Sequence, residues 1–194
     1  VVLRTYNGST RAWPYATWTT LSLPMNGDSA WTFEPSGTTN ALNAVAFADA
    51  STGFAVGASG TIRRTTDGGD AWAAQTSGTS NALNAVFALS TTTVYAAGAG
   101  GTIRRTTDGG ANWEAVTSGI TSVINGIAAN SATVGWVVGD GSVIRSTNGL
   151  SNASPAWTSR NVGTGDYKAI NITGGRVWVV GSNGQVRRSG NLNH

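Results

Sequence analysis

The ten residues GTIRRTTDGG at positions 60–69 recur letter for letter at positions 101–110. When residues 31–71 are aligned with residues 72–112 without a gap, 24 of the 41 positions are identical. A repeat of about 40 residues with tryptophan and glycine at fixed places is typical of one four-stranded blade of a β-propeller. The duplicated stretch therefore predicts an all-β fold built from four-stranded antiparallel blades.

Each repeat contains short apolar runs that are separated by turn residues. In the first clear repeat these runs are residues 42–47, 53–57, 60–65 and 72–76. Runs of about five residues bounded by Gly, Ser, Asn and Asp are typical of β-strands, and helical periodicity is nowhere sustained. The first two runs are almost entirely apolar, so we expect both faces of these strands to be covered by neighbouring blades.

The repeat register extends toward both ends of the chain. Trp31, Trp72, Trp113 and Trp157 occupy the same place in successive repeats. We expect one propeller domain over residues 1–194 with five blades: an irregular first blade at 1–35, clear repeats at 41–78, 82–118 and 123–160, and an incomplete last blade at 167–194.

The last blade has three expected strands, at 167–173, 176–181 and 185–189. A second alignment places residues 2–8 over residues 143–149, which leaves another assignment open for the N-terminal run. It would then be a third strand of the last blade, paired within one chain or with another subunit. Unpaired backbone groups at the edge of an incomplete blade would favour such strand exchange.

The turn after the third run has the form Ser/Thr-x-Asp-x-Gly-x-x-Trp. This pattern resembles the Asp-box of sialidases and of many non-enzymatic propellers. With Ile-Arg-Arg ahead of it and Leu-Asn-Ala-Val behind it, the repeat most resembles propellers of the photosystem II assembly and stability factor type, over roughly residues 20–190. The residues that carry the pattern are Thr65, Asp67, Gly69, Trp72, Thr106, Asp108, Gly110 and Trp113.

The two Asp residues of these turns are expected to be structural. An Asp in a turn accepts hydrogen bonds from nearby backbone N–H groups, glycine supplies positive φ, and the Trp ring covers the apolar interior. A catalytic acid rarely recurs in every blade, and Asp-Gly-Gly lacks the alternating ligands of a calcium loop. We therefore expect neither a metal nor a cofactor.

Catalysis is not expected either. The resemblance to sialidases would imply an arginine triad, a Tyr nucleophile with a Glu partner, and an acidic Asp. Glu34 and Glu114 are the two Glu residues, both on expected outer strands, and no pair of acids falls near the inner strands. Cys is absent and the single His is His194.

Arginine recurs in two adjacent columns of the repeat. One column holds Arg64, Arg105, Arg145 and Arg188, and the preceding column holds Arg63, Arg104 and Arg187, where Ile144 interrupts. Equivalent positions of successive blades form a ring. Two interpretations stay open: a partner-binding basic surface, as the assembly-factor resemblance implies, or structural pairing with the turn carboxylates and stacking on the turn Trp rings.

Composition narrows the function further. The formal net charge is +3 with 11% charged residues, too little for long-range attraction of nucleic acid. No apolar run is long enough to span a bilayer. A sequon at Asn152 lies in a loop insertion and could be glycosylated.

Together these features predict an exported, non-catalytic propeller, extracellular or in the cell envelope. It would bind a protein partner or self-associate as a homo-oligomer, acting as an assembly or scaffold unit. Two alternatives are a soluble module that binds an acidic protein and a carbohydrate-binding or degenerate sialidase-like propeller.

Overall fold

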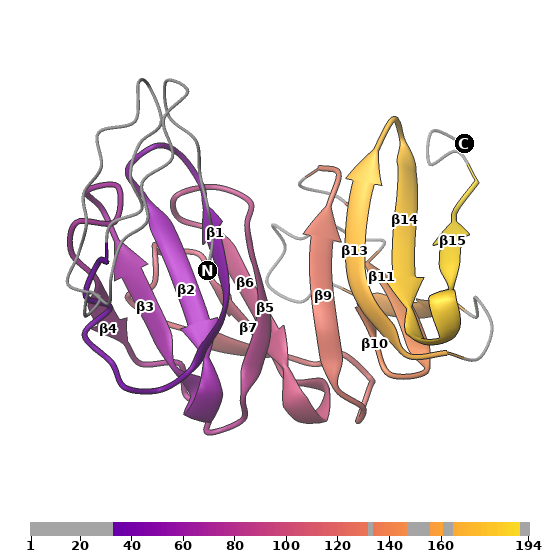
Figure 1. The fold of residues 1–194 in the computed structure, drawn as a ribbon, viewed down its shortest axis with the longest axis horizontal. Coiled ribbons are helices and arrows are strands. Elements are labelled where there is room, and N and C mark those ends of the chain that lie inside the picture. Colours follow the sequence, from indigo (N-terminus) through magenta and orange to yellow (C-terminus); the bar gives the residue numbers. More distant parts are fainter. Residues whose placement is uncertain (1–32, 132–133, 147–155, 161–164, 191–194) are drawn as a thin grey trace, which may run out of the picture. The chain divides into compact units, whose positions relative to one another are not determined.

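The structure is a computed structural model that describes residues 33–131, 134–146, 156–160 and 165–190 (Figure 1). The chain divides into two compact units, Val1–Phe33 and Glu34–His194. The irregular first blade expected at 1–35 falls almost wholly outside the described residues, so the count of five blades stays a prediction.

The second unit contains four antiparallel sheets, in each of which consecutive strands pair side by side (Figure 1). The first sheet is β1 (Leu42–Phe47), β2 (Gly53–Gly57), β3 (Ile62–Thr65) and β4 (Ala73–Gln75). The second sheet is β5 (Leu83–Ala88), β6 (Val94–Gly98), β7 (Ile103–Thr106) and β8 (Glu114–Val116). The predicted all-β fold of four-stranded antiparallel sheets is confirmed.

The third sheet is β9 (Ile124–Ala129), β10 (Gly135–Gly139), β11 (Ser142–Ser146) and β12 (Trp157–Arg160). The fourth sheet is β13 (Tyr167–Thr173), β14 (Arg176–Gly181) and β15 (Val186–Arg188). One-turn 3₁₀ helices at Ala58–Gly60, Ala99–Gly101 and Ser182–Gly184 join the second strand to the third.

Strand positions agree with the sequence pattern, with small shifts at turns. The runs expected at 42–47 and 53–57 are β1 and β2 as predicted. The run expected at 60–65 begins instead at Ile62, because Gly60 has φ +68 and closes the preceding 3₁₀ turn. β13 and β14 have the bounds expected, 167–173 and 176–181, whereas β4 and β15 are shorter than the runs expected at 72–76 and 185–189.

The first strands of successive sheets lie next to one another in the order β1, β5, β9, β13. The second strand of each sheet also contacts the first strand of the next sheet. This is the arrangement of neighbouring propeller blades, with the first strand of each blade innermost.

Apolar side chains from adjacent sheets form the core. Between the first and second sheets they are Phe54, Val56, Ile62, Leu83, Val94, Ala96 and Trp113. Between the second and third sheets they are Ala85, Tyr95, Ala97, Ile103, Ile124, Ile127 and Val137. Between the third and fourth sheets they are Trp136, Val138, Tyr167, Val177 and Val179. Each large side chain buried there contributes about 1.5–3 kcal/mol.

An aromatic residue occupies the second position of β2, β6 and β10 and the equivalent position of β14. These residues are Phe54, Tyr95, Trp136 and Trp178, and each of the first three packs against the next sheet in the chain. Trp136 is 7% exposed, whereas Trp178 is 37% exposed. Trp178 therefore occupies a position that contacts the next sheet elsewhere in the molecule. Among the described residues, no sheet follows the fourth one.

The first sheet shows the matching feature on its opposite side. Leu42 is 39% exposed, although its equivalent in the second sheet, Leu83, is fully buried. Val45 and Phe47 on the same strand are also exposed, as are Val180 and Val186 in the fourth sheet. We call Leu42, Val45 and Phe47 the β1 face, and Trp178, Val180 and Val186 the β14 face.

Candidate functional site

The two turns that carry the repeated Thr-Thr-Asp-Gly-Gly sequence have nearly identical hydrogen bonds. The Thr65 hydroxyl donates to Asp67 Oδ1 at 2.6 Å and accepts from the Gly69 N–H at 3.0 Å. The Ala71 N–H donates to the same Asp67 oxygen at 3.1 Å. Each turn is thus closed by its own Thr and Asp side chains.

The second turn repeats this network forty-one residues later. The Thr106 hydroxyl donates to Asp108 Oδ1 at 2.7 Å and accepts from the Gly110 N–H at 2.8 Å. The Asn112 N–H donates to Asp108 Oδ1 at 2.9 Å, and its side-chain amide donates to Oδ2 at 2.8 Å. Gly69 and Gly110, with φ of +111 and +96, allow the chain to reverse there.

These hydrogen bonds keep both carboxyl groups ionised. The Thr65 hydroxyl and the Ala71 N–H lower the pKa of Asp67. The backbone N–H and the side chain of Asn112, together with the Thr106 hydroxyl, lower the pKa of Asp108 to about 2. A carboxyl group with so low a pKa is a poor proton donor at neutral pH.

The Trp residue after each turn packs differently in the two sheets. Trp113 is 8% exposed and meets the Phe54 ring of the first sheet edge-on, with ring centroids 6.1 Å apart. Trp72 is partly exposed and meets Phe47 of its own sheet at the same centroid distance. Of these two Trp residues, Trp113 joins two sheets and Trp72 packs within its own.

Arg63 and Arg104, from the column that precedes Arg64 and Arg105, contact the loop before their own sheet. Arg63 donates to the Gly37 carbonyl oxygen and Arg104 to the Gly78 carbonyl oxygen. The partners are therefore backbone carbonyls rather than the turn carboxylates that the structural interpretation expected. A planar guanidinium with several donors suits such bonds to a loop.

In the column of Arg64 and Arg105, the side chains lie close to the molecule's interior. The Arg64 guanidinium carbon is 6.0 Å from the centroid of the Phe54 ring, and Arg64 lies close to Gly109 of the next turn. Arg105 is 4% exposed. These two arginines therefore lie in or beside the contacts between sheets and do not project freely into solvent.

Arg187 and Arg188 differ from the arginines of the first two sheets because both are exposed. Arg187 Nε donates to Gln185 Oε1 at 3.4 Å, and the Arg188 guanidinium carbon lies 5.6 Å from the Trp178 ring centroid. The side chain of Arg145 and the sequon at Asn152 lie outside the described residues. The exposed part of the arginine columns is thus concentrated on β15.

A column of asparagines ties each first strand to the next one. The side-chain amides of Asn43, Asn84 and Asn125 donate to the carbonyl oxygens of Leu83, Ile124 and Tyr167 at 2.9, 3.2 and 2.9 Å. Asn125 also donates to Asp140, which forms an ion pair with Lys168 at 3.0 Å. Lys168 lowers the pKa of Asp140.

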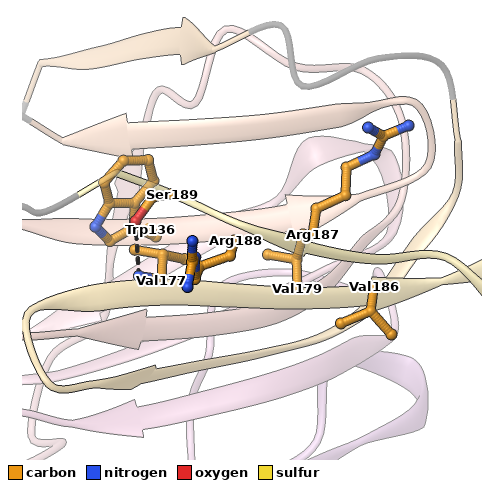
Figure 2. A pocket seen from close by; sticks show the side chains of 7 residues that line it. All are labelled: Trp136, Val177, Val179, Val186, Arg187, Arg188 and Ser189. Atoms are coloured by element: carbon orange, nitrogen blue, oxygen red, sulfur yellow. Dashed lines mark hydrogen bonds between the residues drawn. The ribbon is translucent and has the colours of Figure 1, made fainter.

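A pocket of about 400 Å³ opens between the third and fourth sheets (Figure 2). Its lining combines apolar and basic side chains: Trp136, Val177, Val179, Val186, Arg187, Arg188 and Ser189. The sequence interpretation did not identify it.

The described residues contain no group of three or more His, Cys, Asp or Glu side chains arranged to hold a metal ion. In the same part of the chain, the search for a helix long and apolar enough to cross a membrane finds none.

The family model described as "Photosynthesis system II assembly factor YCF48" matches residues 23–119. No curated protein matches the sequence. Among solved structures, YCF48 from Cyanidioschyzon merolae is 19% identical with a TM-score of 0.63, and the match covers 76% of this chain and 50% of that one. The chain thus spans half the length of that YCF48 structure.

Two further structures share the fold. The computationally designed protein Ika4 is 16% identical with a TM-score of 0.65, and the match covers 79% of this chain and 92% of Ika4. An ancestral GH74 enzyme is 17% identical with a TM-score of 0.53, over 71% of this chain and 21% of the enzyme. At these identities the similarity concerns the fold alone.

Proposed function

Since the chain belongs to the Photosynthesis system II assembly factor YCF48 family, we propose that it is a non-catalytic β-propeller that acts by protein–protein contact. It would serve as an assembly or scaffold unit. The observation that carries this proposal is the pair of exposed apolar faces, the β1 face and the β14 face. Their apolar side chains resemble those buried between the internal sheets. Leaving such side chains exposed to water is unfavourable unless a partner covers them.

The two faces are complementary by their place in the repeat. The residues of the β14 face are equivalent to Phe54, Val56 and Ile62, which the first sheet uses to contact the second. The β1 face holds Leu42, the equivalent of Leu83 on the other side of that contact. This arrangement supports head-to-tail self-association, in which the β14 face of one chain covers the β1 face of a second copy. The edge of β15 that pairs with no described strand would add strand pairing to this contact.

The absence of catalysis is part of the proposal. The carboxyl groups of Asp67 and Asp108 are engaged in turn hydrogen bonds, and Asp140 is paired with Lys168. The Cys-free sequence with few charges supports export to the cell envelope or the extracellular space. Fractionation of the producing cells, with detection of the chain by antibody, checks the location; recovery only from the cytoplasm would contradict it.

Self-association is tested by light scattering over a range of protein concentrations. We expect the unchanged chain to dimerise or form larger species, whereas Val45→Lys or Val180→Lys alone removes one face and reduces the association. Thr66→Lys, at an exposed turn position, is the control and should leave it intact. A mixture of the Val45→Lys and Val180→Lys chains retains one intact contact and should form a heterodimer. A strict monomer at high concentration would contradict this part of the proposal.

A second candidate partner is an acidic protein, favoured by the exposure of Arg187 and Arg188. Binding of a labelled octaglutamate peptide, measured by fluorescence anisotropy, should be lost when both residues are replaced by Gln. Arg176→Gln on β14, which removes one positive charge away from β15, is the control and should keep most of the binding. Equal binding by all three proteins would remove this candidate.

A further inference from the structure

The dipeptide Asn-Gly occurs five times in the sequence, and two of these copies, at Asn125 and Asn183, lie in the part of the chain that the structure describes. Asparagine is chemically labile, and a following glycine favours its deamidation because glycine has no side chain to hinder attack on the asparagine amide. The two copies have different surroundings, so the structure indicates which of them reacts first.

Asn183 is the middle residue of the 3₁₀ turn Ser182–Gly184, which joins β14 to β15. Its φ and ψ are +58 and +32, a left-handed conformation that asparagine tolerates better than most residues. Asn183 is exposed, and its side chain makes no hydrogen bond within the described ranges. Ser59 and Gly100, at the same place in the first two sheets, are exposed as well. The exposure is therefore a property of this turn in every sheet that has it.

The turn around Asn183 is held less firmly than the equivalent turns. The Gln185 N–H donates to the carbonyl oxygen of the first turn residue at 3.3 Å, whereas the N–H groups of Thr61 and Thr102 make the equivalent bonds at 3.0 and 3.1 Å. The Thr61 hydroxyl also donates to the same carbonyl oxygen in its own turn, at 2.7 Å. Gln185 lacks the hydroxyl that makes this bond. Since longer hydrogen bonds are weaker, the turn at Asn183 should open more readily.

Asn125 has the same neighbour in sequence but is held in β9. Its side-chain amide donates to the Tyr167 carbonyl oxygen and to Asp140 Oδ1, both at 2.9 Å. Gly126 is buried and pairs with Val138 of β10. Reaction at Asn125 would require this innermost strand to separate from its neighbours, and core strands open only at a free energy close to that of global unfolding.

We propose that Asn183 is a spontaneous modification site, at which opening of the turn lets the side-chain amide convert to a carboxylate as the folded chain ages. The Gly184 amide nitrogen gives up its proton and attacks the side-chain carbonyl carbon of Asn183. The side-chain nitrogen leaves as ammonia, and a cyclic succinimide forms. Water then opens the ring at either of its two carbonyl carbons, which gives aspartate or isoaspartate.

The two products affect the fourth sheet differently. Aspartate keeps the backbone unchanged and adds one negative charge to the exposed turn. Isoaspartate adds a carbon atom to the main chain inside a one-turn helix, so the bond between the Gln185 N–H and the Ser182 carbonyl oxygen cannot persist unchanged. Because β15 begins directly after this turn, the isoaspartate form should hold β15 less firmly against β14.

The test compares the two copies within one protein. The folded 194-residue chain is incubated in mildly alkaline buffer and sampled by peptide mapping with mass spectrometry. We expect Asn183 to convert about tenfold faster than Asn125, or more, because local opening at Asn183 requires less free energy. Methylation by an isoaspartyl methyltransferase identifies the isoaspartate product. In urea both residues should convert at comparable rates, since the fold no longer distinguishes them.

Two variants separate the turn from the dipeptide. Gln185→Thr restores the residue of the first two turns, leaves Asn-Gly intact and should slow conversion of Asn183 a few-fold, as expected for one added hydrogen bond. Asn183→Ser introduces the residue that Ser59 shows to be compatible with this conformation, at φ +55, and should abolish conversion at the turn. Circular dichroism verifies that both variants are folded.

Three results would overturn the proposal: no conversion of Asn183, equal rates at Asn125 and Asn183 in the folded chain, or an unchanged rate in Gln185→Thr. The inference goes beyond the protein-binding function and does not rest on it. Light scattering tests self-association separately, so failure of one proposal leaves the other intact.

Discussion

Equivalent positions form the contact between the first and second sheets and the contact between the third and fourth sheets. The two contacts differ in the side chains that cover them. In the former, Trp113 meets Phe54 edge-on and closes the apolar cluster. In the latter, Trp136 lines a pocket beside β15, and β15 pairs only with β14 among the described strands. The same repeat therefore makes a closed core in one place and an accessible surface in another. Among the described residues, Trp113 and β8 of the second sheet have no counterpart in the fourth sheet.

The largest effect is expected from removing that side chain where it is present. Trp113→Ala leaves a cavity between the first and second sheets and should lower the free energy of unfolding by about 3–5 kcal/mol. Urea denaturation followed by circular dichroism measures the loss. Trp72→Ala is the control, because Trp72 is more exposed and packs within its own sheet, and it should cost less. Equal losses of unfolding free energy in the two variants would show that the contact of Trp113 with Phe54 adds no stability beyond that of a Trp within its own sheet.

A smaller effect is expected at a glycine where the chain passes close to another strand. A Cβ atom on Gly98 would lie 2.0 Å from the Ala82 carbonyl oxygen, so Gly98→Ala must displace backbone at the start of β5. We expect destabilisation of about 1–3 kcal/mol.

The matching position in the fourth sheet sharpens this comparison. Gly181→Ala would bring a Cβ atom to 2.3 Å from the Asp166 carbonyl oxygen, in a sheet with an open side. Gly181→Ala should therefore lower the free energy of unfolding less than Gly98→Ala in the same urea experiment. Gly190→Ala is the neutral control, because an added Cβ atom would have no other atom within 4 Å.

The asparagine column gives a test of the coupling between neighbouring sheets. Asn84→Ala removes the hydrogen bond to the Ile124 carbonyl oxygen and should cost about 1 kcal/mol. Asn125→Ala removes the bond to Tyr167 and also the bond to Asp140, so its cost should be larger. A smaller cost for Asn125 would mean that the fourth sheet is held mainly by its apolar contacts.

The smallest effect is expected for the change of stability with falling pH. The folded-state pKa of Asp108 is about 2, below its ordinary value of 3.8, so the stability that its ionised form provides is present above pH 3.8. That contribution should be lost as the pH falls from about 4 toward 2. Comparison of urea midpoints with those of Asp108→Asn isolates it; parallel pH profiles for the two proteins would contradict the role of Asp108.

The fold was largely predictable because the repeat displays each strand several times in the sequence. Runs such as 42–47 were found at their correct bounds, since apolar residues there alternate with clear turn signals. The start of β3 was misplaced by the left-handed conformation of Gly60, which the strand pattern does not reveal.

The environment of the candidate site was harder to predict. The partners of Arg63 and Arg104 are backbone carbonyls 26 residues away, and no side-chain pattern in the sequence identifies a carbonyl. The pocket depends on which face of β14 meets Trp136, a relation that appears only when two sheets are placed together. The roles of Arg145 and Asn152 stay predictions.

The asparagine column has a consequence for how such a molecule can grow. Each of these side chains donates a hydrogen bond to the next first strand, and each apolar cluster joins adjacent sheets. Stability in such an array is close to a sum over sheets and the contacts between neighbours. A duplicated copy of residues 72–112 would therefore bring both halves of its own contact with it, so lengthening by whole repeats requires no compensating change elsewhere.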